Sequence, residues 1–129
     1  MKRHVDFLGA LYVVWGALTV VIGLATLALG LGAAALGGSP AVTLRGGAMA
    51  AALAAGTFTV LAVLSIAWGT THIACGLALR RRRPWARPVC LGLAGVNLIL
   101  LPYGTALGAY GLWVLLNDEV RQHFEPAHA

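Results

Sequence analysis

Long apolar runs separated by short charged clusters are the feature that most restricts the possible folds of this chain. The runs extend from Phe7 to about Leu31, from about Leu44 to Leu79, from Trp85 to Leu101, and from Tyr103 to Asn117. Only 10% of the 129 residues are charged, whereas about a quarter of the residues of a typical soluble domain are charged. A soluble domain of this size could not bury so much apolar surface, so we expect an integral membrane protein.

These runs predict helices, because they are too long for strands and show no alternation of polar and apolar residues. We expect one all-α domain over residues 1–129, with four transmembrane helices at about 6–31, 44–79, 85–101 and 103–124. They would form an up-down-up-down antiparallel four-helix bundle. At 1.5 Å per residue, the first two helices could reach about 45 Å and the other two about 22–27 Å. The bundle would therefore have a long first hairpin and a short second hairpin.

The basic residues predict how the chain is oriented. Basic residues near the ends of membrane helices favour the cytoplasmic side. If both termini are cytoplasmic, Arg45 alone lies outside, and every other basic residue lies inside. The net charge of +5 arises from these flanking clusters, so we do not expect a nucleic-acid partner. The candidate contacts to anionic phospholipid headgroups are Arg80, Arg81, Arg82, Arg83, Trp85 and Arg87, with each basic residue contributing about 1 kcal/mol.

Small residues recur every seven positions along both long helices. The first helix carries Gly9, Gly16, Gly23 and Gly30, and the second carries Ala48, Ala55, Ala62, Gly69 and Gly76. A seven-residue period keeps one face directed toward a partner helix, and small residues allow two backbones to approach closely in a membrane. Two interpretations remain open: the stripes face each other within one chain, or one of them forms a subunit interface.

The apolar helices also contain a sparse layer of polar side chains. Trp15, His72, Asn97 and Tyr110 all lie about 12–15 Å from the cytoplasmic helix ends, at 1.5 Å per residue. One interpretation is a packing network in which Asn97 bonds to His72. The alternatives are a pocket for a mostly apolar ligand, such as a lipid or a quinone, and proton relay by neutral His72.

Two cysteines, Cys75 and Cys90, lie near the predicted cytoplasmic side. Because that compartment is reducing, we expect no structural disulfide. His72, Cys75 and Cys90 could converge on a soft metal ion, but their spacing matches no known metal motif. The sequence also lacks the common catalytic and phosphate-binding motifs. We therefore expect neither a cofactor nor an enzymatic activity.

Two stretches of the C-terminal third resemble a known group of proteins. They are RPWAR at Arg83–Arg87 and PYGTALGAYGLWVLLNDEVRQHF at Pro102–Phe124. This pattern is similar to that of a family of small bacterial membrane proteins with four spans. The resemblance implies four helices in a bacterial inner membrane, and it implies no activity and no site residues.

From these observations we expect a non-enzymatic four-helix protein of the bacterial inner membrane. It would associate with itself or with partner membrane proteins through its Gly/Ala faces. The alternatives are an oligomeric channel or carrier for a small or hydrophobic solute, and a membrane subunit that binds a lipid or a quinone.

Overall fold

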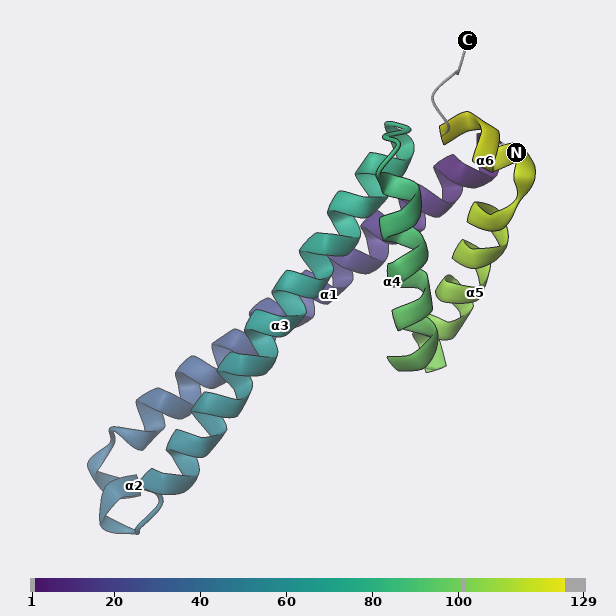
Figure 1. The fold of residues 1–129 in the computed structure, drawn as a ribbon. Coiled ribbons are helices and arrows are strands. Elements are labelled where there is room, and N and C mark those ends of the chain that lie inside the picture. The colour runs from purple at the N-terminus through teal and green to yellow at the C-terminus, as the bar shows by residue number, and fades with distance from the viewer. Residues whose placement is uncertain (1, 101, 125–129) are drawn as a thin grey trace. The chain divides into compact units, whose positions relative to one another are not determined.

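A computed structural model describes residues 2–100 and 102–124, and it is helical throughout with short turns between the helices (Figure 1). The prediction of an all-helical chain is confirmed over this part. The helices are α1 Lys2–Gly37, α2 Pro40–Leu44, α3 Ala48–Arg80, α4 Ala86–Leu100, α5 Pro102–Leu116 and α6 Asp118–Phe124. With 36 and 33 residues, α1 and α3 are long and apolar enough to cross a membrane. Helices α4 and α5 have 15 residues each. Leu101, the predicted end of the third helix, lies outside the described residues.

The helix boundaries differ from the predicted ones at several places. Helix α1 begins at Lys2 rather than near residue 6, the short helix α2 was not expected, and α3 begins at Ala48 rather than at Leu44. Helix α1 continues to Gly37, beyond the predicted end near Leu31, because the added residues include three alanines, which favour helices. The predicted last helix is divided at Asn117 into α5 and α6. The side-chain oxygen of Asn117 accepts a hydrogen bond of 3.1 Å from the backbone N–H of Glu119. This bond caps the start of α6, where a helix leaves backbone donors without partners.

The chain divides into two compact units. One, the hairpin unit, consists of residues 17–70 and contains the later part of α1, all of α2 and most of α3. A Cβ atom added to any of three α1 glycines would lie 3.1–3.3 Å from a Cβ atom of α3; the pairs are Gly23 with Ser65, Gly30 with Phe58, and Gly37 with Ala51. Because the partner numbers fall as the glycine numbers rise, the two helices are antiparallel and closely packed.

The other, the four-helix unit, comprises residues 2–16, 71–100 and 102–124 of the described chain. It contains four longer helical segments, which are the start of α1, the end of α3, α4 and α5, together with the seven-residue α6. Helices α4 and α5 pack against each other as a hairpin (Figure 1). Their backbones approach closely, because a Cβ atom at Gly108 would lie 2.6 Å from the carbonyl oxygen of Ala94. Leu8, Leu79 and Leu115 are fully buried in this unit.

The arginine turn, Arg80–Arg83, ends α3 with a hydrogen-bonded cap. The N–H groups of Arg82 and Arg83 donate to the carbonyls of Leu79 and Ala78, each at 3.0 Å. Arg82 has φ 52°, the left-handed conformation that closes many helices at this position. The four-residue cluster that the sequence assigns to headgroup contact is thus also the turn that stops α3.

Candidate functional site

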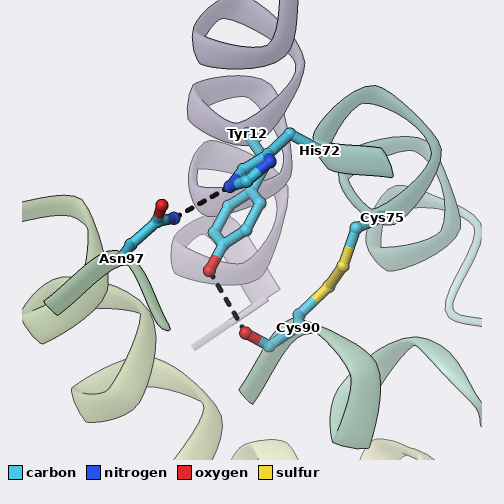
Figure 2. Close-up of a disulfide and its surroundings, with 5 residues drawn as sticks. All are labelled: Tyr12, His72, Cys75, Cys90 and Asn97. Carbon is cyan, nitrogen blue, oxygen red and sulfur yellow. Dashed lines mark hydrogen bonds between the residues drawn. A yellow bond between two sulfur atoms is a disulfide. The ribbon is translucent and has the colours of Figure 1, made fainter. Parts of the chain in front are cut away.

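The polar layer of the four-helix unit is built around His72, which is fully buried on α3. Its Nε2 atom lies 2.8 Å from Nδ2 of Asn97, which is 3% exposed on α4 (Figure 2). The ring of Tyr12, from α1, stacks on the imidazole with a centroid distance of 5.5 Å and an interplanar angle of 19°. The amide nitrogen of Asn97 is a donor, so this hydrogen bond forms in the His72 tautomer whose Nε2 carries no proton and accepts.

Tyr12 also contacts helices α4 and α5. Its hydroxyl donates a 3.3 Å hydrogen bond to the backbone carbonyl of Cys90 on α4 (Figure 2). On α5, a Cβ atom at Gly111 would lie 3.2 Å from the same hydroxyl oxygen, so glycine leaves the space that the phenol occupies. One side chain therefore contacts structure from α3, α4 and α5.

A disulfide joins Cys75 of α3 to Cys90 of α4 beside this layer (Figure 2). The expectation of two reduced cysteines is therefore wrong. Their Cα atoms lie 6.0 Å apart, which is within the usual range for a disulfide. Both residues are buried, with exposures of 1% and 0%, and such burial limits the access of water-soluble reductants. The reductants of a compartment act on cysteines that they can reach, and these two are enclosed by packing between helices.

The disulfide also affects the proposal that His72, Cys75 and Cys90 bind a soft metal ion. A soft metal ion would need thiolate ligands from the cysteines. With both sulfur atoms in the disulfide, Cys75 and Cys90 do not provide them. Among residues 2–100 and 102–124, no group of three His, Cys, Asp or Glu side chains is placed to hold a metal ion.

The other two members of the predicted polar layer are only half-buried. Trp15 is half-buried on α1. Tyr110 is half-buried on α5, and its hydroxyl lies 3.2 Å from Nδ1 of the exposed His4. The structure brings His72 and Asn97 together and adds Tyr12 to them.

Sequence reasoning missed Tyr12, although a signal for it was present. Tyr12 lies three residues after Gly9, and His72 lies three residues after Gly69. In a seven-residue repeat, the position three after the first contact position also faces the partner helix. Small residues and the polar layer thus belong to one repeating pattern.

The small-residue stripes are largely buried. On α1, the stripe residues Gly9, Gly16, Gly23 and Gly30 are all buried. On α3, the later stripe residues Ala62, Gly69 and Gly76 are buried, Ala55 is half-buried, and Ala48 is exposed. A Cβ atom at Gly9 would lie 2.9 Å from the carbonyl oxygen of Gly76, and one at Gly76 would lie 2.9 Å from the backbone nitrogen of Val13. The two glycines thus let the backbones of α1 and α3 touch.

The predicted headgroup residues are not equivalent. Arg80, Arg81, Arg82 and Arg83 are exposed, and Trp85 is 49% exposed. Arg87 is half-buried, and its Nε–H donates a 3.0 Å hydrogen bond to the carbonyl of Leu115 in the last turn of α5. A positive charge is favourable at the carbonyl end of a helix. Arg87 therefore connects the start of α4 to the end of α5.

No family model, curated protein or solved structure matches this chain. What the His72 layer can do chemically follows from the positions of its own side chains. In the described part of the chain, every buried side-chain nitrogen or oxygen has a hydrogen-bond partner. A layer whose polar groups bond to one another positions helices against each other, because bonds left unmade in an apolar medium are costly.

Proposed function

We propose that this chain is a non-enzymatic, four-span protein of a bacterial inner membrane that associates with copies of itself. The single observation that carries the proposal is the apolar surface of α1 and α3. Of the most apolar 18-residue window of each helix, only 28% of α1 and 6% of α3 are buried inside the protein. The core helix of a soluble protein would be mostly buried, whereas lipid can cover such a surface.

The second pair of spans is proposed to be α4 and α5. Fifteen residues extend about 22 Å as a helix, which is less than the roughly 30 Å hydrocarbon core. Local thinning of the bilayer and the flanking turn residues would make up the difference, at a cost of fractions of a kcal/mol per Å. The pattern of basic residues supports cytoplasmic termini and a cytoplasmic arginine turn.

The disulfide is compatible with this orientation. Its two cysteines are buried beneath the arginine turn. Glutathione and thioredoxin act from water, so a bond enclosed by helices in a membrane is protected from them even on the cytoplasmic side.

Self-association is proposed to use glycines that the fold leaves open. The α1 stripe is covered by α3 within the chain, so it is not available to a second copy. On α4, by contrast, a Cβ atom at Gly92 or Gly95 would meet nothing within 4 Å. The neighbouring Val89 and Val96 are 41% and 39% exposed. Close approach of a second helix at small residues of this kind is a common mode of association in membranes.

The buried layer supports a packing role over a catalytic or transport role. Asn97 is bonded to His72, and the hydroxyl of Tyr12 is bonded to a backbone carbonyl. A pore or a catalytic site needs polar groups that are available to a solute or a substrate.

Topology can be tested by labelling single cysteines with a membrane-impermeant maleimide in intact cells. Ser39→Cys and Ile99→Cys should react from outside, whereas Arg82→Cys should react only after permeabilisation. Labelling of Arg82→Cys in intact cells would reverse the orientation. Protection of Ile99→Cys, with Ser39→Cys labelled, would replace the second pair of spans by a hairpin that enters and leaves on one side.

Self-association can be tested by native mass spectrometry from mild detergent. Gly95→Leu should reduce the copy number of the complex and leave the helix content unchanged. Gly32→Leu is the matched control, because a Cβ atom at Gly32 of α1 also meets nothing within 4 Å. A monomeric native protein, or equal copy numbers in both variants, would contradict the proposed interface.

A further inference from the structure

A groove lies between the first turns of α1 and the C-terminal half of α5. It is lined by Arg3, His4, Phe7 and Tyr110, and its volume is about 580 Å³. This volume falls within the range of about 300–1,000 Å³ that is typical of small-molecule sites. All four residues belong to the four-helix unit. Neither the arginine turn nor the His72 layer contributes to this groove.

The rings of Phe7 and Tyr110 line the groove, and Trp113 packs against the lining residues Tyr110 and His4. The rings of Phe7 and Tyr110 meet edge to face at 6.2 Å, and those of Tyr110 and Trp113 stack at 6.1 Å. The imidazole of His4 meets the edge of the Trp113 ring at 5.9 Å and lies 3.2 Å from the Tyr110 hydroxyl. The four rings therefore support one another, although Phe7 and Trp113 are each more than half exposed.

The groove combines this apolar wall with a positive charge at its end. Arg3 carries the charge, and exposed Lys2 precedes it. Tyr and Trp concentrate where hydrocarbon meets headgroups, and basic residues at the same level attract anionic lipid. An amphiphile with a negative headgroup and an apolar tail matches both parts of the groove.

We propose that this groove binds one anionic phospholipid of the cytoplasmic leaflet. Arg3 contacts its phosphate, His4 donates or accepts a hydrogen bond at the headgroup, and the acyl chain lies along Phe7, Tyr110 and Trp113. The occupant must be a lipid rather than a soluble anion, because a soluble anion would leave the exposed aromatic wall uncovered.

A neighbouring groove shows why the charge pattern matters. That groove has a volume of about 450 Å³ and is lined by Asp6, Leu77, Arg80 and Arg81. Its carboxylate competes with an anionic headgroup for the two arginines. Asp6 follows Arg3 by three residues on the same side of the helix, but it lines the neighbouring groove and not the aromatic one. The aromatic groove is therefore the better site for a negative headgroup.

The inference rests on the proposed membrane location, and lipids with brominated acyl chains test the two separately. Bromine quenches tryptophan fluorescence only at short range. The signal of Trp113 is the difference between the native protein and Trp113→Phe, which retains the other three tryptophans. Vesicles contain a minority of phosphatidylglycerol in phosphatidylcholine, with one lipid or the other brominated.

We expect Trp113 to be quenched by brominated phosphatidylglycerol well beyond its share of the bilayer. Arg3→Gln should lower this preference about fivefold, which corresponds to about 1 kcal/mol for one basic residue at an anionic surface. Lys2→Gln is the matched control, because it removes the same charge one residue away and does not line the groove. It should leave the preference nearly unchanged.

Three outcomes would overturn the inference. They are equal quenching by the two lipids, equal losses in Arg3→Gln and Lys2→Gln, and displacement of the lipid by inorganic phosphate. If the remaining tryptophans of Trp113→Phe are not quenched by either lipid, the membrane location itself fails. If they are quenched while Trp113 shows no preference, only the lipid site fails.

Discussion

Two glycines of α3 provide a sharp test of how α1 and α3 pack. A Cβ atom at Gly76 would lie 2.5 Å from the carbonyl oxygen of Gly9 and 2.9 Å from the backbone nitrogen of Val13. A Cβ atom at Gly56 would meet nothing within 4 Å. Gly76→Ala and Gly56→Ala therefore make the same chemical change in the same helix, and only one of them creates a clash.

The structure predicts opposite signs for the two substitutions. Overfilling a packed site typically costs about 1–3 kcal/mol. Two of the three atoms in the way at Gly76 are backbone atoms, which cannot rotate aside, so we expect a loss near the upper end, about 3 kcal/mol. Gly56→Ala should instead stabilise the helix by about 0.5–1 kcal/mol, because alanine has the higher helix propensity. The two variants should therefore differ by more than about 3 kcal/mol.

The measurement is the free energy of unfolding in mixed micelles, obtained by titrating a mild detergent with dodecyl sulfate and following circular dichroism. Gly76→Ala should unfold at a lower dodecyl sulfate fraction than the native protein, and Gly56→Ala at an equal or higher one. If both variants unfold at the same point, the close contact between the start of α1 and the end of α3 is wrong.

Three further predictions concern the four-helix unit, and each is measured by the same titration. The double substitution Cys75→Ala, Cys90→Ala should cost about 3 kcal/mol, because the disulfide closes a loop of about 15 residues; a loss below about 1 kcal/mol would mean that the bond does not constrain the unfolded chain. A double-mutant cycle of His72→Leu and Asn97→Leu should give a coupling energy of about 0.6–1.7 kcal/mol, and a value of zero would argue against their hydrogen bond. Tyr12→Phe should cost about 1 kcal/mol by removing the bond to the Cys90 carbonyl, and a neutral effect would show that this hydroxyl contributes nothing.

Much of the local architecture follows from the sequence. The apolar runs predict helices, and the arginine turn marks the end of one of them. The extension of α1 to Gly37 and the break at Asn117 were not predicted. Both depend on the balance between weak local propensities and capping bonds, which composition alone does not resolve.

The candidate site was predicted only in part. His72 and Asn97 were identified because polar side chains are rare in these apolar runs. Depth along the helix groups Trp15 and Tyr110 with His72 and Asn97, and it does not single out Tyr12. Depth along a helix follows from counting residues, whereas the direction of a side chain depends on the rotation of the helix about its axis. Two residues at equal depth can therefore face different neighbours.

The sequence by itself determined the helical character of this protein and the apolar surface of its two long helices, because both depend on local composition and spacing. The tertiary structure alone decided that Cys75 bonds to Cys90, that Tyr12 stacks on His72, and that Arg87 reaches the end of α5. Each of these contacts joins segments far apart in the chain. Their formation depends on how helices are rotated and aligned when they pack, and no local pattern encodes that alignment.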